Sequence, residues 1–211
     1  MGPDYAKLRR LHVGATKKLG RAAPRLETRR LLLRSFEEDD VEAWARIMRD
    51  PEVMRYLGDG ARYRVKRLAA GLVARFSDIE ARRAVSYLIH HWAEFGYGEW
   101  AIEERATGSL VGRVGLIYQT DWDAEPTRIE IGWSLAPESW GRGYATEGAC
   151  AALAYAFDEL EIERVISICR VDHHRSERVM QRINLSLQGR TRWKGGDSLW
   201  YAADRETWQA P

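Results

Sequence analysis

The sequence predicts a single domain of the mixed α/β (α+β) class, built on a central β-sheet flanked by helices. The chain has 211 residues, of which 45% are hydrophobic and 30% charged, enough for one domain with a full core. Strand-like runs follow one another directly in the middle of the chain. The sheet is therefore expected to be mixed rather than fully parallel.

The first half of the chain predicts one strand and two helices. LETRRLLLRSF (26–36) has the apolar content of a strand. EEDDVEAWARIMRDPEV predicts a helix, because its acids fall in the first turn, apolar residues recur at helical spacing and Pro51 stops it. A second helix is expected over 62–95, ended by Gly96 and Gly98. Its apolar face includes Val65, Leu68, Leu72 and Phe76.

The second half predicts a strand-rich order. YGEWAIEERATGSLVGRVGLIYQ reads as two strands joined by a turn at 106–108, and RIEIGWSL (128–135) as a third. Alternation along the third strand puts Glu130 and Gly132 on the side opposite Ile129 and Ile131. The remaining elements are a helix over about 144–158, the strand ERVISICRV, the helix HHRSERVMQRI, and the closing strands LQGRTRW and SLWYAAD.

Composition argues against membrane and secreted classes. No run approaches the roughly 18 apolar residues of a membrane span, and the N-terminus lacks the apolar stretch of a secretory signal. Cys150 and Cys169 lie in helix-like and strand-like contexts, which favours reduced packing residues and a cytoplasmic protein.

Residues 1–25 form a basic N-terminal extension before the expected domain at 26–211. They carry seven basic side chains and one acidic side chain, although the whole chain has a net charge of +2. Such a pattern is typical of a solvated, flexible arm. Contact with RNA or with an acidic partner surface is the alternative.

The segment ESWGRGYATEGA (138–149) joins a strand to a helix through two glycines separated by one arginine. A nucleotide P-loop is excluded because the GxxxxGK[ST] pattern is absent from the segment. A dinucleotide fingerprint is disfavoured because Thr146 occupies its third glycine position. Two interpretations remain, a turn without a ligand or backbone N–H groups that bind a diphosphate, with Arg142 as an added cation.

Four segments in order resemble the GNAT acyltransferase superfamily, specifically its RimJ/RimL-like branch of ribosomal-protein N-terminal acetyltransferases. They are LETRRLLLRSF…DDVEAWARIMRDPEVMRYL, YGEWAIEERATGSLVGRVGL, IEIGWSLAPESWGRGYATEG and HHRSERVMQRINL, and the resemblance covers roughly residues 26–208. It implies a single GNAT-like domain whose twisted sheet is splayed between the strands at about 128–135 and 164–170.

The chain departs from the family pattern at several positions. The acyl-CoA loop, usually Q/R-x-x-G-x-G/A, keeps Gly143 and Ala145 but begins with Trp140. In the later helix Ser176 is retained, His173 stands where the branch has asparagine, and Met180 stands where many members have tyrosine.

The resemblance implies an N-acetyltransferase in which a primary amine attacks the thioester of acetyl-CoA directly. The diphosphate is expected on the amides of the glycine turn, and the pantetheine arm along exposed strand backbone at 133–135, where an amide near Leu135 polarises the thioester oxygen. The residues expected to bind the cofactor are Trp133, Ser134, Leu135, Trp140, Gly141, Arg142, Gly143, Tyr144, Ala145, Thr146, His173 and Ser176.

Two residues are expected to move protons. Glu130 is the candidate base, acting through water on the side of the strand that it shares with Gly132. Ser176 is the candidate acid, since Met180 cannot donate a proton. The alternative for Glu130 is a surface or salt-bridged carboxylate without a catalytic role, and the alternative for Ser176 is a helix-surface hydroxyl or one that only contacts CoA.

The run Asp172-His173-His174-Arg175-Ser176 does not predict a metal site, because adjacent histidines on a helix face different directions. Asp172 is expected to cap the helix instead. No metal cofactor is expected.

Two other functions fit the sequence. One is a non-catalytic sensor that binds acyl-CoA, and the other is a ribosome- or RNA-associated protein that acts through the basic arm. The acceptor, which is a protein or peptide N-terminus or a small-molecule amine, the acyl chain length and the choice between monomer and homodimer stay open. Nucleic acid contact outside the arm and membrane association are not expected.

Overall fold

The computed structural model describes residues 22–57 and 77–211. Its elements in chain order are β1 (Leu26–Glu27), β2 (Leu31–Arg34), η2 (Glu38–Asp40), α2 (Val41–Met48), α3 (Pro51–Met54), α4 (Asp78–Phe95), β3 (Glu99–Glu104), β4 (Ser109–Tyr118), β5 (Ile129–Leu135), η3 (Pro137–Ser139), α5 (Tyr144–Ala154), η4 (Tyr155–Glu159), β6 (Arg164–Arg170), α6 (His174–Arg182), β7 (Ser186–Trp193) and β8 (Gly196–Asp204). Within the described ranges, no helix is long and apolar enough to cross a membrane.

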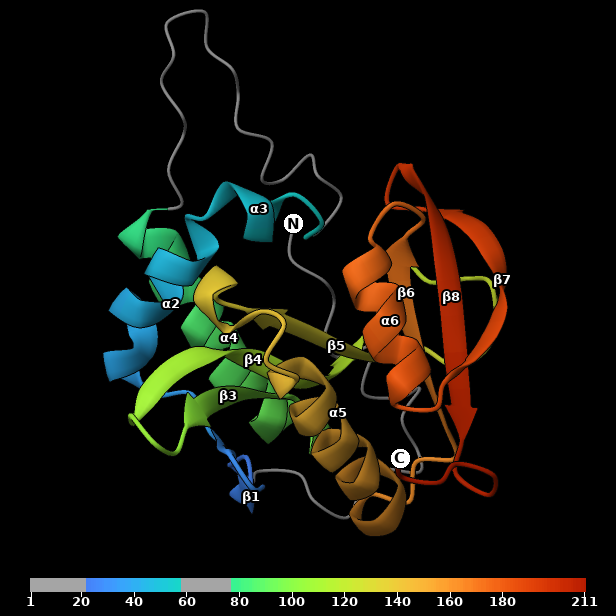
Figure 1. The fold of residues 1–211 in the computed structure, drawn as a ribbon, viewed down its shortest axis with the longest axis horizontal. Helices are drawn as coiled ribbons and strands as arrows, with labels where there is room; N and C mark the ends of the chain where they lie inside the picture. The colour runs from blue at the N-terminus through green and yellow to red at the C-terminus, as the bar shows by residue number, and fades with distance from the viewer. Residues whose placement is uncertain (1–21, 58–76) are drawn as a thin grey trace, which may run out of the picture.

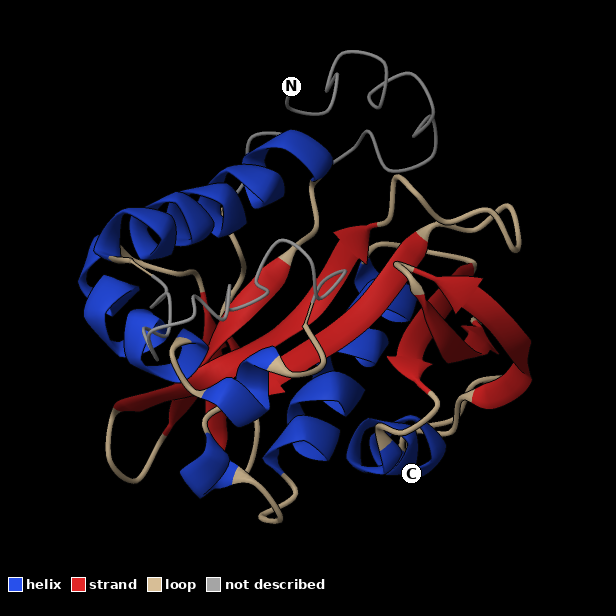
Figure 2. Ribbon diagram, turned by 90° about the horizontal axis from the view of Figure 1, so that it is seen from above, coloured by secondary structure: helices blue, strands red, loops and turns tan. Residues whose placement is uncertain are grey.

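The eight strands form one mixed sheet in the order β1-β2-β3-β4-β5-β6-β8-β7. All neighbours pair antiparallel except β5 and β6, which run parallel and are registered by the single pair Glu130–Ile166. Beyond that pair the two strands diverge, and Figure 2 shows β6, β8 and β7 turned away from the long strands. The prediction of a mixed sheet splayed between β5 and β6 is confirmed.

Helices cover both faces of the sheet. In the β3–β4–β5 register, alternate residues such as Ile102, Val114 and Ile131 share one core with Ala149 and Leu153 of α5. The opposite face carries Ala101, which packs in a second core with residues of α2 and α4. Figure 1 shows α5 on the near side of β4 and β5, and α6 lying over β6.

The first predicted strand, 26–36, is two short strands rather than one. The backbone N–H of Thr28 donates to the carbonyl of Leu31 at 2.9 Å, which closes a turn between β1 and β2. The Thr28 hydroxyl also donates to a carboxylate oxygen of Glu147 on α5 at 2.6 Å. This contact with α5 holds the turn in place. The apolar pattern of residues 26–36 could not predict the turn, because it carries no information on contacts with distant residues.

Helix boundaries differ from the expectations in ways that capping explains. Pro51 does not simply stop a helix, because Asp50 accepts hydrogen bonds from the next amides and Pro51 opens α3. Ser77 forms a capping box with Glu80, so α4 begins at Asp78. The expected helical residues before Ser77, including Val65, Leu68, Leu72 and Phe76, lie outside the described residues.

The helix predicted over about 144–158 ends as an α-helix at Ala154 and continues as the π-helical turn η4. Gly96 ends α4 in the left-handed conformation, with φ of 74°, as predicted.

One side chain links β5 to β6 at the point where the two strands begin to separate. Ser167 on β6 is buried, and its hydroxyl donates to the carbonyl of Ile131 on β5 at 2.9 Å, next to the point where strand pairing stops. We expect Ser167→Ala to lower the free energy of unfolding by about 1–2 kcal/mol, because the buried Ile131 carbonyl loses its partner. Urea unfolding measures this change.

Ser109→Ala is the matched control, because Ser109 is an exposed residue at the start of β4. An equal effect of the two substitutions would show that the hydroxyl of Ser167 does not hold β5 to β6.

Candidate active site

The glycine turn lies between the end of β5 and the first residue of α5. Gly141 and Gly143 have φ of 73° and 81°, a left-handed conformation that side chains with a Cβ rarely adopt. A Cβ on Gly141 would meet no atom within 4 Å, so the space in front of this residue is open. Gly143 is the N-cap of α5 and gives no side-chain cap to the first amides of the helix.

Side chains from distant elements fix the shape of this turn. The Arg142 guanidinium donates to a carboxylate oxygen of Glu104 at 2.5 Å, and the Tyr144 hydroxyl donates to the same oxygen. Arg30 on the β1–β2 turn donates to the Arg142 carbonyl at 2.8 Å and to Glu147 at 2.7 Å. The charge of Arg142 is therefore paired within the protein.

Hydrogen bonds also keep Glu104 ionised. The bond from Tyr144, followed by the bond from Thr107, holds the pKa of Glu104 below its ordinary value. Arg142 and Arg30 both lie over the Tyr144 ring, at 4.5 and 4.8 Å from its centroid. The shape of the turn is thus fixed by a network that contains the negative charge of Glu104 and the positive charges of Arg142 and Arg30.

Glu130 lies at the point where β5 and β6 separate. It is 8% exposed, accepts a hydrogen bond from the Gln119 side-chain amide, and accepts another from the Ile168 backbone N–H at 3.3 Å. Burial raises the pKa of Glu130 to about 7, although the positive charge of Lys194 and both hydrogen bonds act in the opposite direction. A carboxyl with this pKa exchanges a proton at neutral pH.

Sequence reasoning missed the groups around Glu130. Gln119 follows β4, and its carbonyl oxygen accepts a hydrogen bond from Lys194 at 3.2 Å. Lys194 belongs to the β7–β8 turn, where its φ is 46°. Gln119 and Lys194 are far apart in the chain, so no local sequence pattern relates them. The order of the strands in the sheet is what brings both residues to Glu130.

The predicted residues of α6 lie on the other side of the gap. Ser176 is buried, and its backbone N–H donates to the His173 carbonyl at 3.0 Å. The His173 ring stacks on Tyr56, with centroids 3.9 Å apart, and burial lowers its pKa to about 4. Arg175 lies 4.8 Å above the Trp140 ring, which ties α6 to the glycine turn.

The expectation that Asp172 caps α6 is wrong. The N-cap of α6 is His173, whose side chain makes no capping hydrogen bond. The backbone carbonyl of Asp172 accepts a hydrogen bond from the hydroxyl of Tyr56, a residue that follows α3, at 3.5 Å.

The remaining predicted residues are on β5. Because the Ile131 carbonyl points to β6, where it meets Ser167, the backbone of Trp133 and Leu135 points the same way. Both residues lie beyond the Glu130–Ile166 pair, at the open part of the gap. The Leu135 carbonyl accepts a hydrogen bond from the Trp140 indole at 2.8 Å, while the Ser134 side chain faces the other side of the sheet.

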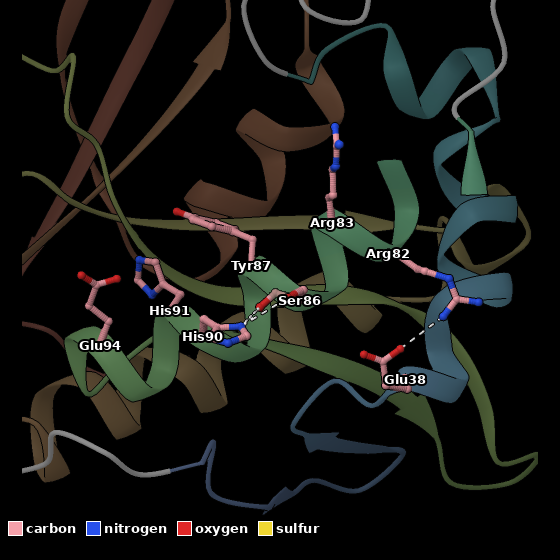
Figure 3. Close-up of a pocket in the computed structure, with 8 residues that line it drawn as sticks. All are labelled: Glu38, Arg82, Arg83, Ser86, Tyr87, His90, His91 and Glu94. Atoms are coloured by element: carbon pink, nitrogen blue, oxygen red, sulfur yellow. Dashed lines mark hydrogen bonds and ion pairs between the residues drawn. The ribbon is translucent and has the colours of Figure 1, made fainter. Parts of the chain in front are cut away.

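A separate depression of about 550 Å³ lies along α4, away from Glu130 and the glycine turn. Figure 3 shows Tyr87, His91 and Arg83 projecting from α4 there, with Glu38 joined to Arg82. No group of three histidine, cysteine or carboxylate side chains suited to a metal ion occurs among the described residues.

Comparisons with known proteins agree with this geometry. The family model described as an acetyltransferase (GNAT) domain matches residues 30–186. The uncharacterized N-acetyltransferase YnaD of Bacillus subtilis is 30% identical over 189 residues, which is 87% of this chain and 98% of that protein. An acetyltransferase (GNAT family) from Bacillus anthracis superimposes with a TM-score of 0.68 at 27% identity, over 87% of this chain and 99% of that one.

A further relative is the FsC-acetyl coenzyme A-N(2)-transacetylase of Aspergillus fumigatus. It is 30% identical over 157 residues, which cover 69% of this chain and 58% of that protein. The family match, the eight-stranded splayed sheet and the glycine turn before α5 agree with one another. This chain belongs to the GNAT family of acetyltransferases.

Proposed function

We propose that the protein transfers an acetyl group from acetyl-CoA to a primary amine by direct attack of the amine on the thioester. The observation that carries the proposal is the gap between β5 and β6, which has the glycine turn at one end and Glu130 at the other. The relative from Aspergillus fumigatus is named for acetyl coenzyme A, which supports the same donor here. Membership of the RimJ/RimL-like branch is part of this proposal.

The diphosphate of the coenzyme fits the amides at the N-terminus of α5. The amides of residues 141–146 precede or begin this helix, where backbone N–H groups lack intrahelical partners and the helix dipole favours an anion. The open space in front of Gly141 admits a ligand close to the backbone. Arg142 contributes by its pairing with Glu104, which holds the shape of the turn.

The pantetheine arm fits beside β5. The backbone groups of Trp133 and Leu135 point into the gap, where an amide-bearing chain can pair with them as an added strand does. A backbone N–H there is placed to stabilise the oxyanion that forms on the thioester carbonyl. His173 and Ser176 form the facing wall on α6.

Glu130 is the proposed base. With a pKa of about 7, it is ionised in a large fraction of molecules at neutral pH and accepts a proton from the ammonium, directly or through one water. The attacking nitrogen forms the new C–N bond, the C–S bond breaks, and the thiolate takes up a proton.

Ser176 is the proposed donor of that last proton. His173 has a pKa of about 4, so its ring is neutral at pH 7 and is not an acid there. Met180 has no exchangeable proton to donate, and it is fully buried in the main core. The Ser176 hydroxyl is the remaining predicted donor on α6.

The first prediction from the proposed function concerns the glycine turn. We expect Gly143→Glu to weaken CoA binding at least a hundredfold in calorimetry, because its carboxylate repels the diphosphate at the start of α5. Gly108→Glu is the control, since Gly108 has a similar φ of 68° in the remote β3–β4 turn. Unchanged affinity of the Gly143 variant would remove the turn from the coenzyme site.

The second prediction concerns the rate. We expect the wild-type kcat to rise with pH through a midpoint near 7, where Glu130 loses its proton. Glu130→Gln should lower kcat at pH 8 about a hundredfold or more and remove that midpoint. The assay follows release of free thiol with a panel of amines. Binding of CoA without turnover on any amine would favour an acyl-CoA sensor instead.

The third prediction concerns stability. In the folded protein the pKa of Glu130 is raised from 4.5 to about 7. The contribution of Glu130 to the free energy of unfolding is therefore fully present below pH 4.5 and is lost as the pH rises through 7. Relative to Glu130→Gln, the wild type should therefore lose up to about 3 kcal/mol of unfolding free energy between pH 4.5 and pH 8. Urea unfolding of both proteins at both pH values tests this, and a constant difference would contradict the raised pKa.

A further inference from the structure

Three buried polar atoms belong to neighbouring residues at the sheet face that carries Glu130. They are the indole Nε1 of Trp44, the Nε of Arg113 and the hydroxyl of Ser134, and each lacks a hydrogen-bond partner among the described residues. Trp44 is 2% exposed and Ser134 is 7% exposed. A buried polar atom without a partner costs free energy, so a group of three on one surface points to a ligand that satisfies them.

The three residues come from different elements and are neighbours. Arg113 on β4 pairs with Ser134 on β5 in the strand register. The Arg113 guanidinium carbon lies 5.6 Å from the ring centroid of Trp44 on α2. The cluster therefore joins the sheet to the helix that covers it.

The cluster and Glu130 lie on the same face of β5. Alternation along β5 puts Glu130, Gly132 and Ser134 on one face of the sheet. A Cβ on Gly132 would meet no atom within 4 Å, so the strand is bare between the two polar side chains. Gly132 therefore places no side chain between Glu130 and the cluster.

The charges of the site select the kind of group that the cluster binds. Arg113 forms an ion pair with Glu99, which is 4% exposed. The cation is thus neutralised, and two carboxyl groups, Glu99 and Glu130, already face this region. A further carboxylate would be repelled, whereas a neutral oxygen accepts hydrogen bonds from the indole and guanidinium N–H groups.

We infer that Trp44, Arg113 and Ser134 bind a neutral carbonyl or hydroxyl oxygen of the acceptor, several bonds from the amine that Glu130 deprotonates. The inference rests on the proposed acetyl transfer and adds the class of acceptor. Glu130 and Ser134 are four residues apart on one strand, which spans about 13 Å between their Cα atoms. An acceptor of peptide-like or amino-alcohol length bridges the two ends.

The experiment compares four primary amines of matched length with acetyl-CoA and the full-length protein. They are an alkylamine, an amino alcohol, a dipeptide amide and an amino acid with a terminal carboxylate. We expect kcat/KM to be at least about tenfold higher for one of the two neutral oxygen-bearing amines than for the alkylamine, and lowest for the carboxylate. The amino alcohol and the dipeptide amide separate a hydroxyl from a carbonyl as the source of the oxygen.

Variants then test the residues. Trp44→Phe keeps a ring in the core and removes the N–H, and Ser134→Ala is a second, smaller change. Each should lower the ratio of kcat/KM for the preferred oxygen-bearing amine over the alkylamine about tenfold, through KM. A residue with a structural role alone would lower both rates together and leave the ratio unchanged.

Trp122→Phe is the matched control, since Trp122 is also fully buried with an indole N–H that lacks a described partner, but packs in a separate cluster with Ile166 and Ala202. It should leave the ratio at the wild-type value. Equal turnover of the alkylamine and the oxygen-bearing amines, or an equal change of the ratio in the Trp122 and Trp44 variants, would overturn this inference alone. Absence of turnover with every amine would overturn the proposed function itself.

Discussion

The structure depends on the loss of strand pairing between β5 and β6. Seven neighbouring strand contacts hold the sheet together, but the parallel contact is registered by one residue pair, Glu130–Ile166. In an intact sheet, the facing backbone N–H and C=O groups of β5 and β6 would bond to each other. Here the backbone of β5 beyond Glu130 points to a gap, so the sheet itself provides hydrogen-bonding groups for a ligand. Where the two strands begin to separate, the Ser167 hydroxyl supplies a hydrogen bond to the Ile131 carbonyl.

The same divergence explains the properties of Glu130. Glu130 is the last paired residue of β5, and its burial there raises the pKa of its carboxyl group. Gln119 and Lys194 approach from the β4 and β7 ends and limit this rise. The balance between burial and these neighbours places the pKa at about 7, near the operating pH that suits the base proposed above.

Much of the fold could be predicted from the sequence because its signals are local. The turn at 106–108, the end of α4 at Gly96 and the side of β5 that Glu130 shares with Gly132 follow from glycine conformation and from alternation. The family resemblance, which the comparisons confirm, added the splayed sheet.

Other features could not be predicted because they depend on register and tertiary contacts. The pairing of Arg142 with Glu104 joins residues on different elements, and sequence alone suggested a free cation at the turn. The stacking of His173 on Tyr56 joins distant parts of the chain in the same way, and His173 rather than Asp172 is the N-cap of α6. The placement of Trp44 over Arg113 requires the angle between α2 and the sheet, which no periodicity encodes.

The internal neutralisation of the glycine turn has a consequence for how an anion is held there. Since Arg142 is matched by Glu104 and Arg30 by Glu147, the turn has little net charge to attract ions from a distance. Under the proposed function, the diphosphate would therefore be bound by the oriented amide dipoles of the turn, which act over a few ångströms and depend on the shape of the ligand. On that proposal, the turn should distinguish a diphosphate ester from simple inorganic anions by shape, and its affinity should depend less on ionic strength than that of a cluster of free cations.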